Sequence, residues 1–283
     1  MVLIPSHFLA SVPARKLLEG DYRVSLRIDR INCDVEKYKN HYSKRIFNFD
    51  IEDEIFLEDD LVRGLHGFRV RIKASDEVFR IGRILENYRR MVPVFFADVD
   101  ESLFKKVNFL TGLGFQVHLN TENPPSDAGT LEKVLEFYLH NPLLKTPVEP
   151  FHSLLKTLSS GSGYTLWETE YENIKTNIFI SDDNRVSLSK RWYGRGLIYG
   201  SAGDSWEELT ASELYNNLKS FKKELFRRKS DCIYCAHMDI CGGFLKAVDA
   251  DWPCEAWISV FDILRREVAD AREILQKYAE GNR

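Results

Sequence analysis

The sequence lacks any apolar run of 18 residues, the length that spans a membrane as a helix. Its first segment, Met1–Leu18, also lacks the long apolar core and the small-residue cleavage site of a signal peptide. An excess of positive charge is missing too, because the net charge is -4 and the sequence pI is about 6.0. Nucleic-acid-binding domains usually carry a basic surface. We therefore expect a cytoplasmic protein with neither a membrane nor a nucleic acid as partner.

Cysteine is scarce, but four of the five cysteines in the 283 residues lie close together. Cys232, Cys235, Cys241 and Cys254 have the spacing C-x2-C-x5-C-x12-C. In a reducing cytosol such a group indicates metal ligation more than disulfides, and the odd fifth residue, Cys33, argues against complete pairing. Four thiolates favour either zinc or an iron-sulfur cluster, and the spacing alone leaves both open.

The first half of the chain alternates between strand and helix patterns. Apolar alternation or buried apolar runs predict the strands, and apolar residues at helical spacing predict the helices. The expected strands are Tyr22–Asp29, Lys44–Ile51, His66–Lys73, Val92–Val99 and Phe115–Asn120, and the expected helices are Ser75–Arg90, Asp100–Leu110 and Thr130–His140. Consecutive units of this kind predict a parallel sheet, either open or curved into a partial barrel, with ligands at the carboxyl ends of the strands.

A segment rich in Pro, Ser and Gly separates this half from a different second half. Residues 141–164 contain Pro142, Pro147, Pro150 and a Ser-Ser-Gly-Ser-Gly stretch, which predicts a linker around one short helix. Beyond it we expect a hairpin over Ile174–Lys190, a glycine-dotted loop, a helix over Ser212–Lys229 and a closing helix over Trp257–Tyr278. Two domains are therefore predicted, over residues 1–150 and 165–283.

The second half resembles the SPASM domain, the cluster-binding extension of many radical SAM peptide maturases. In that family a hairpin, a loop and a helix precede C-x2-C-x5-C, with glycines beside the third cysteine. Here the hairpin turn Ser181-Asp-Asp-Asn-Arg-Val186 is followed by a glycine loop, a helix and the run from Cys232 to Cys241-Gly-Gly243. The likeness covers about residues 165–260.

Several residues of the family pattern are missing. Leu188-Ser189 and Leu245 stand where family members often place cysteines for a second cluster. The C-x3-C-x2-C triplet that binds the S-adenosylmethionine cluster is absent, and Ile28-Asp-Arg-Ile-Asn-Cys33 resembles only its lead-in. The Gly-Gly-Glu-Pro stretch is absent as well. The resemblance therefore implies a pseudo-radical-SAM/SPASM protein that does not cleave S-adenosylmethionine by itself.

The fold that this resemblance implies is α/β: a degenerate partial (β/α) barrel with parallel strands, followed by a small α+β SPASM-like cluster-binding domain. Its cofactor is one [4Fe-4S] cluster, ligated by Cys232, Cys235, Cys241 and Cys254. The implied function is that of an accessory protein in ribosomal peptide (RiPP) modification. Its expected partners are a precursor peptide, an active maturase, or both.

Two other functions stay open on sequence. The protein is an enzyme if a substrate peptide binds the crevice of the N-terminal barrel, where His118 and Asp98 are candidate ligand contacts. It is a structural or interaction protein if the four cysteines hold one zinc ion. Two further features are candidates for function: His237, inside the cysteine run, and a basic stretch between Lys219 and Lys229 that fits an acidic partner or a solvated helix face.

Overall fold

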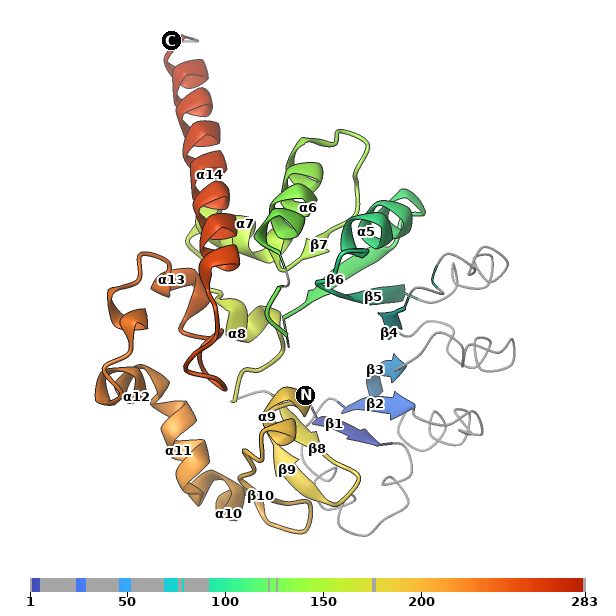
Figure 1. Ribbon diagram of the computed structural model, residues 1–283, viewed down its shortest axis with the longest axis vertical. Helices are drawn as coiled ribbons and strands as arrows, with labels where there is room; N and C mark the ends of the chain where they lie inside the picture. Colours follow the sequence, from blue (N-terminus) through green and yellow to red (C-terminus); the bar gives the residue numbers. More distant parts are fainter. Residues whose placement is uncertain are drawn as a thin grey trace. The chain divides into compact units, whose positions relative to one another are not determined.

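The computed structural model describes most of the chain from residue 92 onward and parts of it before that (Figure 1). The described residues are 2–5, 24–28, 46–51, 69–75, 78, 92–121, 123–125, 127–174 and 177–281, with the side chains of the first three ranges left aside. The chain divides into two compact units, and each is built from two stretches of sequence. The first unit contains Met1–Ala97 and Tyr171–Arg228, and the second contains Asp98–Glu170 and Lys229–Arg283. The division into domains at 1–150 and 165–283 stays a prediction.

The first unit is built on a parallel sheet whose strand order follows the chain. Its parallel strands are β1 (Val2–Pro5), β2 (Val24–Ile28), β3 (Ile46–Ile51), β4 (Arg69–Ala74) and β5 (Val92–Asp98), each paired with the next. Val70 and Ile72 are buried on one face of β4. Val94 and Phe95 are buried on opposite faces of β5, as expected for a parallel strand covered on both faces. The mixed α/β class is therefore confirmed, although β1 falls in a segment for which no strand was predicted.

A hairpin from the second half of the chain extends the same sheet. Strand β8 (Ile178–Ile180) pairs in parallel with β1, and β9 (Arg185–Ser187) and β10 (Gly200–Ser201) continue antiparallel. The hairpin turns at Asp182-Asp183-Asn184, where Asn184 has φ 66°, a left-handed conformation that asparagine tolerates. The predicted hairpin is confirmed.

Four short helices complete the first unit: α9 (Lys190–Gly194), α10 (Trp206–Ala211), α11 (Glu213–Lys219) and α12 (Phe221–Arg227). The prediction of one helix over Ser212–Lys229 was wrong, because the backbone leaves the helical region at Ser220, with φ -112° and ψ 29°. The apolar residues keep helical spacing across this break, which hid it from the sequence pattern.

The second unit is mainly helical. Its elements are α5 (Leu103–Gly112), β6 (Gln116–Asn120), α6 (Ala128–His140), β7 (Val148–Glu149), α7 (Phe151–Ser160), α8 (Leu166–Thr169), a 3-10 helix η4 (Asp231–Tyr234), α13 (Met238–Cys241) and α14 (Glu255–Gly281). Helix α14 packs against α6 and α7 and then extends beyond them (Figure 1). Phe151, Phe244, Trp257 and Phe261 are buried and form much of its core.

Two predictions lie mostly outside the described residues: the helix Ser75–Arg90 and the lead-in that ends at Cys33. Among the helices of the described ranges, none is long and apolar enough to cross a membrane.

Candidate metal centre

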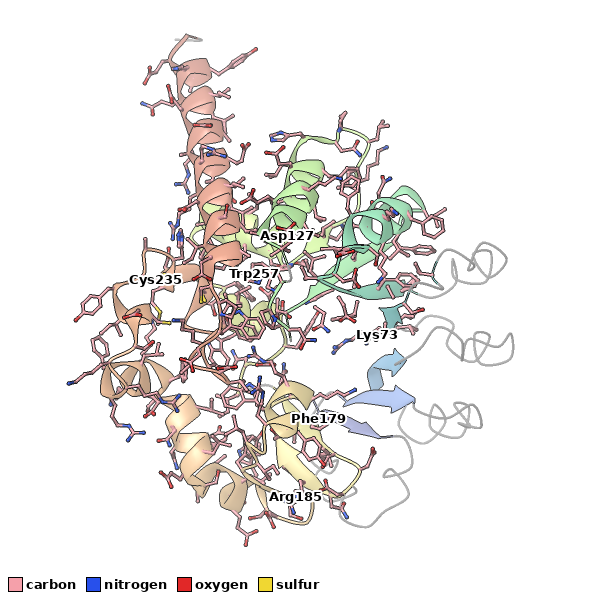
Figure 2. The ribbon with its side chains drawn as sticks, in the orientation of Figure 1. Lys73, Asp127, Phe179, Arg185, Cys235 and Trp257 are labelled. Carbon is pink, nitrogen blue, oxygen red and sulfur yellow. The ribbon has the colours of Figure 1, made fainter. Side chains whose placement is uncertain are left out.

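The first two cysteines of the run lie on one tight turn. The Ser230 hydroxyl oxygen accepts a hydrogen bond from the Cys232 N–H at 3.3 Å and so caps η4. The Cys235 N–H then donates to the Cys232 carbonyl at 3.2 Å. Both thiols are partly exposed, and Figure 2 shows Cys235 on the loop that precedes α13. This turn keeps two sulfur ligands close together, as a C-x2-C motif requires.

The third cysteine ends α13 and lies in a cradle of backbone N–H groups. The chain reverses through Gly242 and Gly243, whose φ angles of 64° and 76° favour glycine. The Phe244 N–H donates to the Cys241 carbonyl at 3.1 Å, and the backbone N–H groups of Gly243, Phe244 and Leu245 favour the charged form of the Cys241 thiol. Burial nevertheless raises the pKa of the Cys241 thiol to about 11, assisted by repulsion from Cys232.

The fourth cysteine stands directly before α14. Its carbonyl accepts the Ile258 N–H at 2.8 Å, the first hydrogen bond of the helix. Burial raises the pKa of the Cys254 thiol to about 12, and repulsion from the Cys241 and Cys232 thiolates adds to this, while Lys246 acts in the opposite direction. Negative charge on Cys241 or Cys232 thus disfavours the Cys254 thiolate.

The four cysteine side chains have the chemistry of ligands for a thiolate-bound metal centre. In the part of the chain that the structure describes, no group of three or more His, Cys, Asp or Glu side chains has the geometry to hold a metal ion. Repulsion among three thiolates is what a cation would relieve, and N–H donors around sulfur are typical partners of ligated cysteine. Trp252, two residues before Cys254, also has a buried indole N–H that no described residue accepts, a donor that a bound sulfur centre could satisfy.

Helix α8 holds the glycine turn behind Cys241. The Trp167 Nε1 donates to the Gly242 carbonyl at 3.0 Å, and its ring meets Phe244 edge to face at 5.4 Å. A capping box between Thr165 and Glu168 fixes the start of this helix. A Cβ at Gly242 would lie 2.8 Å from Trp167 Cδ1. The turn therefore depends on glycine for both its backbone angle and its close contact with the indole.

Helix α14 holds the loop between Cys235 and Cys241. His237 is only 4% exposed. Its Nε2 lies 3.2 Å from Asp262 Oδ1, its Nδ1 accepts from Arg265 Nε at 3.4 Å, and Arg265 also reaches Asp239 and the Ala236 carbonyl. Both ring nitrogens of His237 thus have partners on α14. The sequence pattern gave no sign of this, because Asp262 and Arg265 look like ordinary polar residues of an amphipathic helix.

The other candidate residues of the sequence are hydrogen-bonded within the second unit. His118 Nε2 lies 3.1 Å from Glu170 Oε1, and the Thr121 hydroxyl donates to Glu170 Oε2 at 2.8 Å. The Asn120 amide donates to Asp98 Oδ1 at 2.8 Å. His118 is 2% exposed. Both candidates thus make polar contacts near the end of β6, and none of these hydrogen bonds involves a cysteine.

Ser189 and Leu245, the two residues compared with cysteine positions on sequence, make structural contacts. The Ser189 hydroxyl donates to Glu172 Oε1 at 2.6 Å, and Arg191 Nη2 and Trp192 Nε1 each donate to Glu172 Oε2 at 2.8 Å. Leu245 is buried, and its N–H faces the Cys241 sulfur. A buried ion pair thus ties the segment after the hairpin to Glu172.

Comparison of the chain with known protein families, with curated proteins and with solved structures finds no match. The cysteine site therefore has to be interpreted from its own chemistry.

Proposed function

We propose that the chain is an iron-sulfur accessory protein of a RiPP modification system, with a degenerate partial barrel and a SPASM-like module. Cys232, Cys235, Cys241 and Cys254 would hold one [4Fe-4S] cluster. The observation that carries this proposal is the backbone around Cys241, where the N–H groups of Gly243, Phe244 and Leu245 favour negative charge on one buried sulfur. Hydrogen bonds to sulfur and burial are two means by which proteins tune such clusters.

A cluster ligated by four cysteines has no open iron for S-adenosylmethionine. The chemistry that it supplies when bound is therefore structural support or electron transfer. The chain's own residues would shape the surface around it, since Trp167, Asp262 and Arg265 hold the ligand loops on α8 and α14. We infer that the protein binds a precursor peptide, an active maturase, or both, and catalyses no radical step alone.

The successive order of β1 to β5 also supports a barrel-like sheet. In a (β/α) barrel each strand lies beside the next one in the chain, whereas a doubly wound sheet reverses its order at a switch point. Strands β1 to β5 pair in chain order, and β8 lies in parallel on the other side of β1, where a barrel also places its last strand beside its first.

A structural zinc site is the second candidate, because four thiolates and an N–H cradle suit zinc as well. The test is purification without oxygen, followed by measurement of iron, acid-labile sulfide and zinc per chain. About four irons and four sulfides are expected for one cluster. About one zinc per chain without sulfide would reject the cluster and identify the four cysteines as a structural zinc site.

The test variant is Cys235→Ser, which replaces a cysteine of the run. Its matched control is Cys33→Ser, which replaces the cysteine outside the run. We expect Cys235→Ser to lose most of its iron and Cys33→Ser to keep it. Equal iron content in both variants would contradict the ligand assignment.

A further inference from the structure

The outward face of α11 and α12 in the first unit carries positive charge around an exposed aromatic ring. Phe221, Glu224 and Leu225 are buried, so they form the inward side of α12. Lys219, Lys222, Lys223 and Phe226 are exposed, Phe226 at 65%. Within α12, Phe226 lies four residues after Lys222 and three after Lys223, so these three share the outward side, and Lys219 ends the preceding helix α11. We call these four residues the 219–226 face.

The charges on this face are not neutralised by neighbours. Glu224 accepts from Arg227 Nε and Nη2 at 2.7 Å each and from Arg228 Nε at 2.5 Å, and these bonds lower its pKa to about 2. The only buried carboxylate of α12 is thus engaged by the two arginines. In the described parts of the chain, no ion pair involves Lys219, Lys222 or Lys223.

The local charge also contrasts with that of the whole protein. Residues 213–228 contain five basic and two acidic side chains, although the chain as a whole has a net charge of -4. Phe226, 65% exposed among these lysines, adds an apolar contact surface to the same outward face. The combination points to a partner with both carboxylates and an apolar side chain.

We propose that the 219–226 face docks an acidic peptide segment, with its carboxylates near the three lysines and an apolar side chain over Phe226. The identity of this peptide as a segment of the precursor rests on the proposed function. Lysine side chains are long and mobile, so they accommodate carboxylates in several positions. The contact is therefore expected to be moderate in affinity and sensitive to salt.

The test is fluorescence anisotropy of the full chain with labelled synthetic peptides of about fifteen residues. One peptide is rich in Asp and Glu and contains one Phe, a second replaces that Phe by Gly, and a third replaces the acids by Asn and Gln. We expect binding of the first peptide, weaker binding of the second, none of the third, and a rising Kd with added NaCl.

Two double variants with the same change in net charge locate the site. Lys222→Glu with Lys223→Glu should raise the Kd roughly tenfold or more, because it puts like charges against the ligand. Lys105→Glu with Lys156→Glu, at exposed lysines of the second unit, should leave the Kd nearly unchanged. Phe226→Ala should raise the Kd of the Phe-containing peptide and leave the Kd of the Gly-containing peptide unchanged. Circular dichroism checks that each variant is folded.

Equal effects of the two double variants, or no binding of the acidic peptide, would overturn the proposal. Equally tight binding of phosphatidylserine vesicles or of duplex DNA would overturn it too, since the face would then recognise any polyanion. The metal content of the same samples separates the two proposals. Peptide binding without iron would reject only the cluster, and iron without peptide binding would reject only the docking face.

Discussion

Gly242 is the single residue on which the Cys241 cradle most depends. Its left-handed φ of 64° and the 2.8 Å approach of Trp167 to a Cβ both exclude larger residues. We expect Gly242→Ala to destabilise the protein by roughly 1–3 kcal/mol, from backbone strain plus displacement of the indole. It should also lower the metal content per chain, because the N–H groups of the next three residues would turn away from the sulfur. Urea unfolding and metal analysis measure the two effects.

Gly112 provides the control for that substitution. It lies at the end of α5 in the same unit, and a Cβ there meets nothing within 4 Å. Gly112→Ala should keep the metal and leave stability unchanged or slightly higher, because alanine favours a helix. Similar metal loss in both variants would show that the conformation of the turn is not what matters.

At the scale of elements, the Glu172 contacts are the best candidate for what holds α9 on the hairpin. Glu172 and Arg191 are both only 6% exposed at their side chains and lie 2.8 Å apart. Glu172→Gln keeps the shape but removes the buried carboxylate that Arg191 contacts at 2.8 Å, so we expect a loss of about 3–5 kcal/mol in the free energy of unfolding. Chemical denaturation measures this loss.

The exposed pair Arg185–Asp183, 3.3 Å apart, is the comparison at the same hairpin. Asp183→Asn should cost less than about 1 kcal/mol, because exposed ion pairs contribute little. If Glu172→Gln and Asp183→Asn lower the free energy of unfolding equally, the buried ion pair is not the main contact that stabilises this segment.

At the scale of the whole molecule, metal removal should unfold or loosen the second unit. The four cysteines come from a turn, from the end of α13 and from the start of α14, so one centre would join segments that are otherwise separate. A ligand present at about a thousand times its Kd stabilises by about 4 kcal/mol, which corresponds to roughly 15 °C in Tm for a unit of this size. Calorimetry before and after chelation measures this shift. An unchanged Tm would show that the metal does not stabilise the fold.

The pH dependence of the metal-free protein has a definite sign. Burial raises the pKa of Cys241 to about 11 and that of Cys254 to about 12, from an ordinary 9.0. The folded chain therefore holds these protons more tightly than the unfolded chain, so its stability falls as pH rises above 9 and through these values. Metal uptake must release the same protons, so it should become tighter as pH increases.

Some features could be predicted because they depend on local pattern. The apolar run Val92–Val99 predicted β5, the turn residues Asp182 to Asn184 predicted the hairpin, and apolar spacing predicted α6 and α14. The break at Ser220 escaped the prediction, because the apolar spacing continues through it. The short strand β1 escaped as well, since four residues are too few for a periodic signal.

The sequence by itself determined the ligand chemistry of the candidate site: four thiols at C-x2-C-x5-C-x12-C, and two glycines that permit a left-handed turn. Only the tertiary structure decided what surrounds them. It brought Trp167 to the Gly242 carbonyl from 75 positions away, and Asp262 and Arg265 to His237. The reason is physical: spacing along a chain fixes which atoms are near neighbours, whereas packing of distant helices decides which polar groups are buried together.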